Sequence, residues 1–186
     1  MKWKSLLFIF PAVFLWSVTL NGQQTGNSLT DAILKNYSAR MYSADPVSDT
    51  DIDIILKAGM KAPSASNAQP WFFTVVKDKA LLKDLMPNIT DNNILIVISG
   101  REGNWVDHDC GIAAGYMCIA AQALGLGARI YGGPARAINA GKKEVLGVPE
   151  GYRVITVLRV GHVDKSVDAV SAASPRKKME EVVVYK

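Results

Sequence analysis

The segment 62–71 reads APSASNAQPW and separates two predicted elements of different kinds. Upstream, Ser48 and Asp51 resemble a capping box that begins a helix, and the residue before Pro63 disfavours helical backbone, so the helix ends there. Downstream, 71–76 (WFFTVV) is aromatic and β-branched and predicts a strand. The segment is either an ordinary polar turn or a place where a flat, polar ring can approach the backbone. Its hydrogen-bonding side chains are Ser64, Ser66, Asn67 and Gln69.

Helical and extended patterns alternate along the rest of the chain. Residues 93–99 (NILIVIS) are apolar on both faces and predict a central strand. With 186 residues and no repeat or linker, we expect a single domain over 23–186. The other predicted elements are helices over 29–36, 80–86 and 109–124, two short helices within 134–146, strands over 128–131 and 152–163, and a strand-like tail over 182–185.

The predicted helix 109–124 is apolar nearly all round, which is typical of a buried helix. We expect Asp107 or Asp109 at its start and Gly125 at its end. Small residues on one face would let another backbone come close. That backbone belongs either to a second subunit or to the same chain, and the sequence does not decide between them. The small residues are Gly111, Ala114, Gly115, Cys118, Ala121 and Gly125.

Metal, nucleotide and disulfide motifs are missing from the sequence. Residues 107–110 (DHDC) contain potential metal ligands, but adjacent side chains at a helix start point in different directions, so capping is the better interpretation. No P-loop, G-x-S-x-G or G-x-G-x-x-G motif follows a strand. Cys110 and Cys118 lie on one predicted helix with their Cα atoms about 12 Å apart, too far for a disulfide. An enzyme built from this chain would therefore depend on a bound cofactor.

The first 22 residues resemble a secretory signal peptide. Lys2 and Lys4 precede the apolar stretch 6–20, which is short for a membrane span; an uncleaved anchor is the alternative interpretation. We expect an exported, periplasmic protein that does not remain in the membrane after cleavage. The net charge is only +4, two charges of which come from this segment, and no basic run is interleaved with aromatic residues, so a nucleic-acid partner is not expected.

Four regions together resemble the nitroreductase family, whose members are FMN enzymes. The segment 62–71 is similar to the family signature APSxxNxQPW, and residues 36–42 (NYSARMY) are similar to its RRSxRxF start. Residues 123–127 (ALGLG) resemble the end of its central helix. Residues 174–182 (SPRKKMEEV) resemble its KPRKPLEEV tail. In order and spacing, these regions cover nearly all of the chain after residue 22.

The resemblance assigns roles to individual residues. Ser38 and Arg40 would hold the FMN phosphate and ribityl chain, and Arg176 would reach the same phosphate from the tail. The backbone of Gly132 and Gly133 would approach the ring near its reactive nitrogen. Alternatively, the two arginines are solvated surface charges and the glycines form an ordinary turn. The residues expected to border the ring are Pro63, Ser64, Ala65 and Asn67.

The resemblance also implies a fold and an activity. The fold would be α+β, with a mixed, mainly antiparallel sheet flanked by helices, in an intertwined homodimer that holds FMN at its interface. NAD(P)H would reduce the flavin, and a nitroaromatic, a quinone or a similar small acceptor would take the electrons in a ping-pong mechanism. Because the chemistry takes place on the flavin, no catalytic side chain is expected. In an exported protein, a quinol or a redox protein is an alternative donor.

The sequence departs from the family pattern where the phosphate would bind. Asn36 and Tyr37 replace a basic pair, and Ser174 replaces a lysine, so positive charge is removed. A helical excursion of larger members is missing too, which implies a more open site. Two alternatives follow. One is a non-catalytic protein that binds flavin or another small ligand, and the other is a flavin enzyme with reductive chemistry on substrates other than nitro compounds.

Overall fold

A four-stranded antiparallel sheet forms the centre of the computed structural model, which describes residues 28–34, 36–164 and 176–186. The strand order is β1-β2-β4-β3, and each pairing is antiparallel. Trp71 lies opposite Gly100, and Val157 lies opposite both Val97 and Tyr131. The strands are β1 (Trp71–Val76), β2 (Ile94–Arg101), β3 (Leu126–Tyr131) and β4 (Tyr152–His162). The predicted signal segment 1–22 lies outside the described residues.

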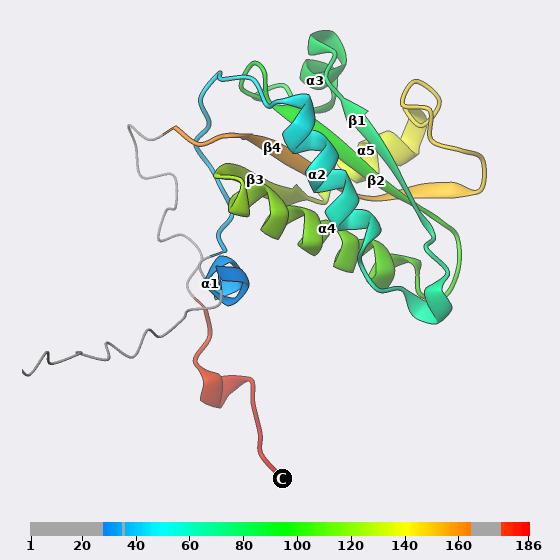
Figure 1. Cartoon of the computed structure of the whole chain (residues 1–186). Coiled ribbons are helices and arrows are strands. Elements are labelled where there is room, and N and C mark those ends of the chain that lie inside the picture. Colours follow the sequence, from blue (N-terminus) through cyan, green and yellow to red (C-terminus); the bar gives the residue numbers. More distant parts are fainter. Residues whose placement is uncertain (1–27, 35, 165–175) are drawn as a thin grey trace, which may run out of the picture.

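Helices cover both faces of this sheet (Figure 1). On one face, α2 (Asp49–Met60) and α4 (Val106–Ala123) pack against alternate residues of the inner strands, such as Ile96 and Leu158. On the other face, α3 (Lys79–Leu85) and α5 (Gly133–Gly141) pack against the intervening residues of the same strands, such as Val97. β2 is buried from Ile94 to Gly100, as a strand covered on both faces should be. The predicted α+β class and the mainly antiparallel sheet are confirmed.

The start of α4 differs from the expectation. The helix begins at Val106, and its N-cap position is Trp105, which makes no capping hydrogen bond through its side chain. Asp107 and Asp109 therefore lie in the first turn and do not cap the helix. The predicted Ser48 cap of α2 is confirmed, because the Asp51 N–H donates to Ser48 Oγ at 3.0 Å.

The small residues of α4 were expected to allow a close backbone approach, but the glycine that allows close helix packing lies on α2. A Cβ on Gly59 of α2 would lie 2.1 Å from Cε of Met117, so this glycine lets α2 pack closely on α4. On α4 itself, Ala114 and Ala121 are buried in the core. At Gly111 and Gly115, by contrast, an added Cβ would meet no atom within 4 Å. The small face is thus divided between the core and the surface.

Smaller differences concern the ends of elements and the tail. Helix α1 spans Ser28–Leu34, and β3 begins two residues earlier than expected. A single helix, α5, replaces the two short helices predicted within 134–146. The tail contains a 3₁₀ turn, η2 (Met179–Glu181), and residues 182–185 form no strand within this chain. The apolar tail residues Val182, Val184 and Tyr185 are exposed. No described helix combines the length and apolar character that crossing a membrane requires.

Candidate functional site

The polar turn, residues 63–69, has an unusual backbone. Ser66, Asn67 and Gln69 have φ values of 51°, 55° and 45°, in the left-handed region that residues with a side chain rarely adopt. Residues 65–67 form a short 3₁₀ turn, η1 (Ala65–Asn67), that is broken by this geometry. Such backbone conformations cluster at ligand-binding and active sites, where the surrounding structure holds them in place.

Hydrogen bonds inside the polar turn hold it in shape. The Gln69 N–H donates to Ser64 Oγ, and the Asn67 N–H donates to the Ser64 carbonyl, both at 3.0 Å. The Ala68 N–H donates to the Ala65 carbonyl at 3.0 Å. Ser64 is half-buried and faces the turn itself. Its hydroxyl therefore supports the turn, whereas Pro63 and Asn67 are exposed toward solvent.

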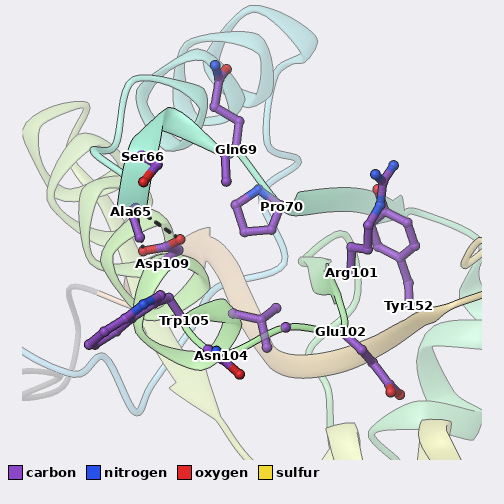
Figure 2. Close-up of a pocket in the computed structure, with 13 residues that line it drawn as sticks. Ala65, Ser66, Gln69, Pro70, Arg101, Glu102, Asn104, Trp105, Asp109 and Tyr152 are labelled. Atoms are coloured by element: carbon purple, nitrogen blue, oxygen red, sulfur yellow. Dashed lines mark hydrogen bonds between the residues drawn. The ribbon is translucent and has the colours of Figure 1, made fainter.

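Asp109 connects the polar turn to α4. Its two carboxylate oxygens lie 3.1 and 3.2 Å from the backbone nitrogen of Ala65, which donates to them (Figure 2). Asp109 is buried, with 1% of its surface exposed. The Ala65 N–H therefore donates to a side chain of the protein. Sequence reasoning assigned Asp109 to a helix cap, because a partner 44 residues away leaves no local pattern.

A pocket of about 420 Å³ lies between the polar turn and the loop after β2 (Figure 2). Trp105 stands at one side with 62% of its surface exposed. Arg101 lies over the Tyr152 ring at 5.5 Å from its centroid on the other side. The Arg101 N–H donates to the Pro70 carbonyl at 2.9 Å and so fixes the far end of the turn. No local sequence pattern indicated this pocket, since its lining comes from three separate segments.

A second pocket, the β3-edge pocket, has a volume of about 300 Å³ and contains one of the predicted site residues, Ser38. Asn36 also lines it, and the Asn36 side-chain nitrogen Nδ2 is buried without a hydrogen-bond partner. A buried donor without a partner is costly unless a ligand or water completes it. Its lining residues are Ile33, Asn36, Tyr37, Ser38, Gly115, Cys118, Ile119, Ala128, Arg129 and Ile130.

The segment that carries Ser38 and Arg40 is fixed to the sheet and to α4. Ala39 is fully buried, and its N–H donates to the Ala128 carbonyl of β3 at 3.2 Å. The Tyr37 backbone exchanges two hydrogen bonds with the Gln122 side chain. Ser38 and Arg40 flank the buried Ala39 and are both exposed. Successive side chains of an extended segment point to opposite sides, so these two point the same way, out of the core.

The remaining predicted residues lie in two places. Gly132 and Gly133 follow β3 directly; both are exposed, and nothing lies within 4 Å of a Cβ built on either one. The segment of Ser38 is attached to β3 at Ala128, and an extended strand from there to Gly132 covers about 13 Å, so the glycines lie just beyond the end of the edge strand that Ser38 borders. Arg176 lies on the exposed tail, which extends away from the sheet in Figure 1.

The predicted residues thus form two groups. Ala65 is attached to α4 at Asp109, and Tyr37 is attached at Gln122, thirteen positions later. At about 1.5 Å per residue these attachment points are about 20 Å apart. The β3-edge group contains Ser38, Arg40, Gly132 and Gly133, and the turn group contains Pro63, Ser64, Ala65 and Asn67. A single chain does not bring the two groups around one slot.

The two thiols of α4 are kept protonated by their surroundings. Burial raises the pKa of the Cys110 thiol to about 12, and the neighbouring carboxylates add to the shift. Burial alone raises the pKa of the Cys118 thiol to about 12. Both cysteines are free. Within the described ranges, no three His, Cys, Asp or Glu side chains come together in a way that could hold a metal ion.

An antiparallel sheet covered by helices on both faces, with a strained polar turn and an edge-strand pocket, defines an α+β protein with two candidate ligand-binding surfaces. The family model described as "Nitroreductase family" matches residues 33–96 and 87–162. The chain therefore belongs to the nitroreductase family, a family of FMN-dependent oxidoreductases, and the sequence-based assignment is confirmed.

Individual relatives agree with this assignment. An Archaeoglobus fulgidus protein named for NADH dehydrogenase and NAD(P)H nitroreductase activity is 36% identical over 149 residues, which is 73% of this chain and 85% of that protein. A solved structure from Bacteroides thetaiotaomicron, named in the same way, has a TM-score of 0.74 and 27% identity over 87% of this chain and 98% of that one. An FMN-dependent nitroreductase from Clostridium difficile has a TM-score of 0.68 and 25% identity, over 82% and 98% of the two chains.

Proposed function

We propose that this protein is an FMN-dependent oxidoreductase that takes electrons from NAD(P)H or another donor and passes them to a nitroaromatic, a quinone or a similar small acceptor by a ping-pong mechanism. The observation that carries the proposal is the β3-edge pocket, where the unpartnered Asn36 Nδ2 lies in the same pocket as Ser38. The FMN-dependent nitroreductase from Clostridium difficile supports the choice of cofactor.

The residues of the β3-edge pocket fit a phosphorylated ligand. Asn36 supplies a buried amide donor without a protein partner, and Ser38 supplies a hydroxyl. Arg40 does not line the pocket, but it lies two residues after Ser38 and has an exposed guanidinium. Asn36 stands where the family pattern has a basic residue, so the site loses one positive charge but keeps a hydrogen-bond donor. Charge-assisted hydrogen bonds from arginine are the strong part of a phosphate site. We therefore expect FMN binding that depends mainly on Arg40, with Arg176 as a second arginine.

Two copies of the chain would complete the site. The β3-edge group and the turn group are about 20 Å apart along α4 in one chain. In a homodimer, the polar turn of one copy would border the ring held along β3 of the other. Gly111 is open on the surface of α4, where a second backbone can come close, and Gly115 lines the β3-edge pocket. The exposed tail residues 182–185 can add to the edge of the partner's sheet.

The protein's own residues would bind and orient the cofactor. Ser38, Arg40 and Arg176 hold the phosphate, the backbone at Gly132 and Gly133 approaches the ring, and the polar turn borders its edge. FMN held by these residues would supply the electron-transfer chemistry between donor and acceptor. Burial raises the pKa of the Cys110 and Cys118 thiols to about 12, so both stay protonated.

The proposal is tested by the visible spectrum of the purified protein and by anaerobic titration with NADH, NADPH and a quinol. We expect a yellow protein whose flavin is reduced by at least one donor and reoxidised by a quinone or a nitroaromatic. Arg40→Met should lower the FMN affinity, whereas Arg136→Met, at an exposed arginine of α5, should not. Flavin that binds and is reduced by none of the donors would instead support a flavin-binding protein without redox activity.

We also propose export directed by residues 1–22. In that case the quinol would reduce the flavin faster than either nicotinamide. Sequencing the amino terminus of protein recovered from the cell envelope tests this, because a chain that still begins at Met1 would contradict cleavage.

A further inference from the structure

We propose that Asp109 positions the polar turn for the flavin, as a remote anchor of the Ala65 backbone. The juxtaposition of a buried carboxylate on α4 and a strained turn 44 residues away carries this inference. It rests on the proposed FMN site. The anchor itself, Asp109, lies on α4 and outside the signature segment 62–71.

The contact is directional and protected from water. Both oxygens of Asp109 lie within 3.2 Å of the Ala65 nitrogen, and the side chain is buried. A hydrogen bond to an ionised group is stronger than one between neutral groups. Asp109 also lies in the first turn of α4, where the helix dipole stabilises a negative charge. The position of Asp109 in α4 therefore favours the ionised form that accepts from the Ala65 N–H.

Two bonds from the protein body fix the two ends of the turn. Asp109 holds its start at Ala65, and the Arg101 N–H holds its end at Pro70. The other hydrogen bonds of the turn lie within residues 64–69. Left-handed backbone at Ser66, Asn67 and Gln69 costs free energy and persists only where the surroundings hold it. Without the Asp109 anchor, the start of the turn can relax.

Asp109 is a positioning residue and not a catalytic one. Its oxygens face Ala65 and the Nδ1 atom of His108, at 3.2 Å, and only 2% of its side chain is exposed. Asp109 is among the residues that line the pocket beside the turn, but with so little of its side chain exposed it offers a ligand almost no surface. The effect of Asp109 on a ligand therefore passes through the geometry of the backbone.

Three substitutions separate this role from a general effect on α4. Asp109→Ala removes the acceptor, whereas Asp109→Asn keeps an oxygen for the Ala65 N–H and can donate to His108 Nδ1. Asp107→Ala is the matched control, since Asp107 lies in the same helical turn but pairs with Arg153 at 2.6 Å. The quantities to measure are the FMN dissociation constant and the hydrogen exchange of the turn amides in the FMN-free protein.

We expect Asp109→Ala to weaken FMN binding at least about tenfold and to speed exchange at residues 65–69. Asp107→Ala should stay within about threefold of the wild type. Asp109→Asn should lose less affinity than Asp109→Ala, because it keeps the acceptor and loses only the charge. Unchanged affinity in Asp109→Ala would overturn the inference while leaving the proposed function intact. An equal loss in Asp109→Asn would also overturn it, in favour of an effect of charge.

If Asp109→Ala does not fold, a second variant tests the same hydrogen bond. Ala65→Pro removes the N–H from the other side of the same bond, and Ser64, at φ −140° and ψ 155°, already has the extended backbone that precedes proline. An equally weakened FMN affinity supports the inference, and a wild-type affinity overturns it. If the wild-type protein itself binds no FMN, the proposed function fails, and faster exchange of the turn in Asp109→Ala would still show that Asp109 positions it.

Discussion

Arg159 lies with its guanidinium 3.9 Å from the centroid of the Tyr42 ring, in the interior of the protein. Arg159 is only 6% exposed, and it donates to Asn93 Oδ1 at 2.7 and 2.9 Å. Asn93 in turn donates from Nδ2 to the Ser43 carbonyl at 3.2 Å. The described residues provide no carboxylate that pairs with Arg159. This network joins β4 to the segment that carries Ser38.

Replacing Arg159 by methionine should destabilise the protein by about 2 kcal/mol, because Asn93 Oδ1 and Thr90 Oγ1 would lose their donor. Urea denaturation measures the free energy of unfolding. Arg101→Met is the control: that arginine also lies over a tyrosine ring, at 5.5 Å, but it is exposed. We expect a change below about 0.5 kcal/mol there. Equal losses in both variants would contradict a role for the buried network.

Gly127→Ala should disturb the same segment from the side of β3. A Cβ at Gly127 would lie 2.7 Å from Cβ of Ala39 and 2.8 Å from Cγ2 of Val163, and neither atom belongs to a flexible side chain. Overpacking of this kind costs about 1–3 kcal/mol. Gly103→Ala, on an exposed loop with no contact closer than 3.9 Å, serves as the control in the same thermal unfolding experiment. A wild-type melting temperature for Gly127→Ala would show that the segment moves aside freely.

The fold was predictable from the sequence wherever the pattern was local. The apolar run of β2, the aromatic β1 and the Ser48 cap all occur in the structure as expected. Gly59 was missed because the requirement for a glycine comes from Met117 on another helix. Asp109 was missed for the same physical reason, since its partner Ala65 is distant in sequence. The site residues were predicted through family motifs, but their division into two groups depends on the length of α4.

Gly111→Leu should prevent self-association. This position is exposed in the single chain, so an added Cβ meets no intramolecular atom, and the replacement removes a helix-destabilising glycine. We therefore expect unchanged or higher monomer stability together with a shift from dimer to monomer in sedimentation velocity. Ile54→Ala, at an exposed position of α2, is the control for a surface change. Dimers that persist in Gly111→Leu would place the interface elsewhere.

The two cysteines should make stability fall at alkaline pH. Burial raises the pKa of Cys110 and of Cys118 from 9.0 to about 12, so the folded protein keeps protons that the unfolded chain loses. Stability is therefore complete below about pH 9 and decreases as the pH rises, by at most about 1.4 kcal/mol per pH unit for each thiol. Urea titrations at pH 8, 9 and 10 measure this slope.

A double variant, Cys110→Ala with Cys118→Ala, provides the comparison for this slope. Its stability at pH 8 can differ because of lost packing, so only the change with pH is compared. We expect the double variant to lose less stability than the wild type between pH 9 and 10. Identical slopes would show that the thiols do not carry the alkaline transition. Burial also raises the pKa of Tyr42, but that group titrates at higher pH.

Asn36→Leu should affect protein stability and FMN affinity in different ways. Nδ2 of Asn36 is buried without a partner in the FMN-free chain, so an apolar side chain of similar size removes a desolvated donor at no cost in protein hydrogen bonds. We expect the FMN-free variant to be as stable as the wild type or more so in urea denaturation. FMN affinity, measured by fluorescence titration, should fall about tenfold, because the ligand loses a donor worth about 1.4 kcal/mol. Asn88→Leu, at an exposed position in the loop after α3, should change neither quantity. Unchanged FMN affinity in Asn36→Leu would mean that the β3-edge pocket binds the phosphate without this amide.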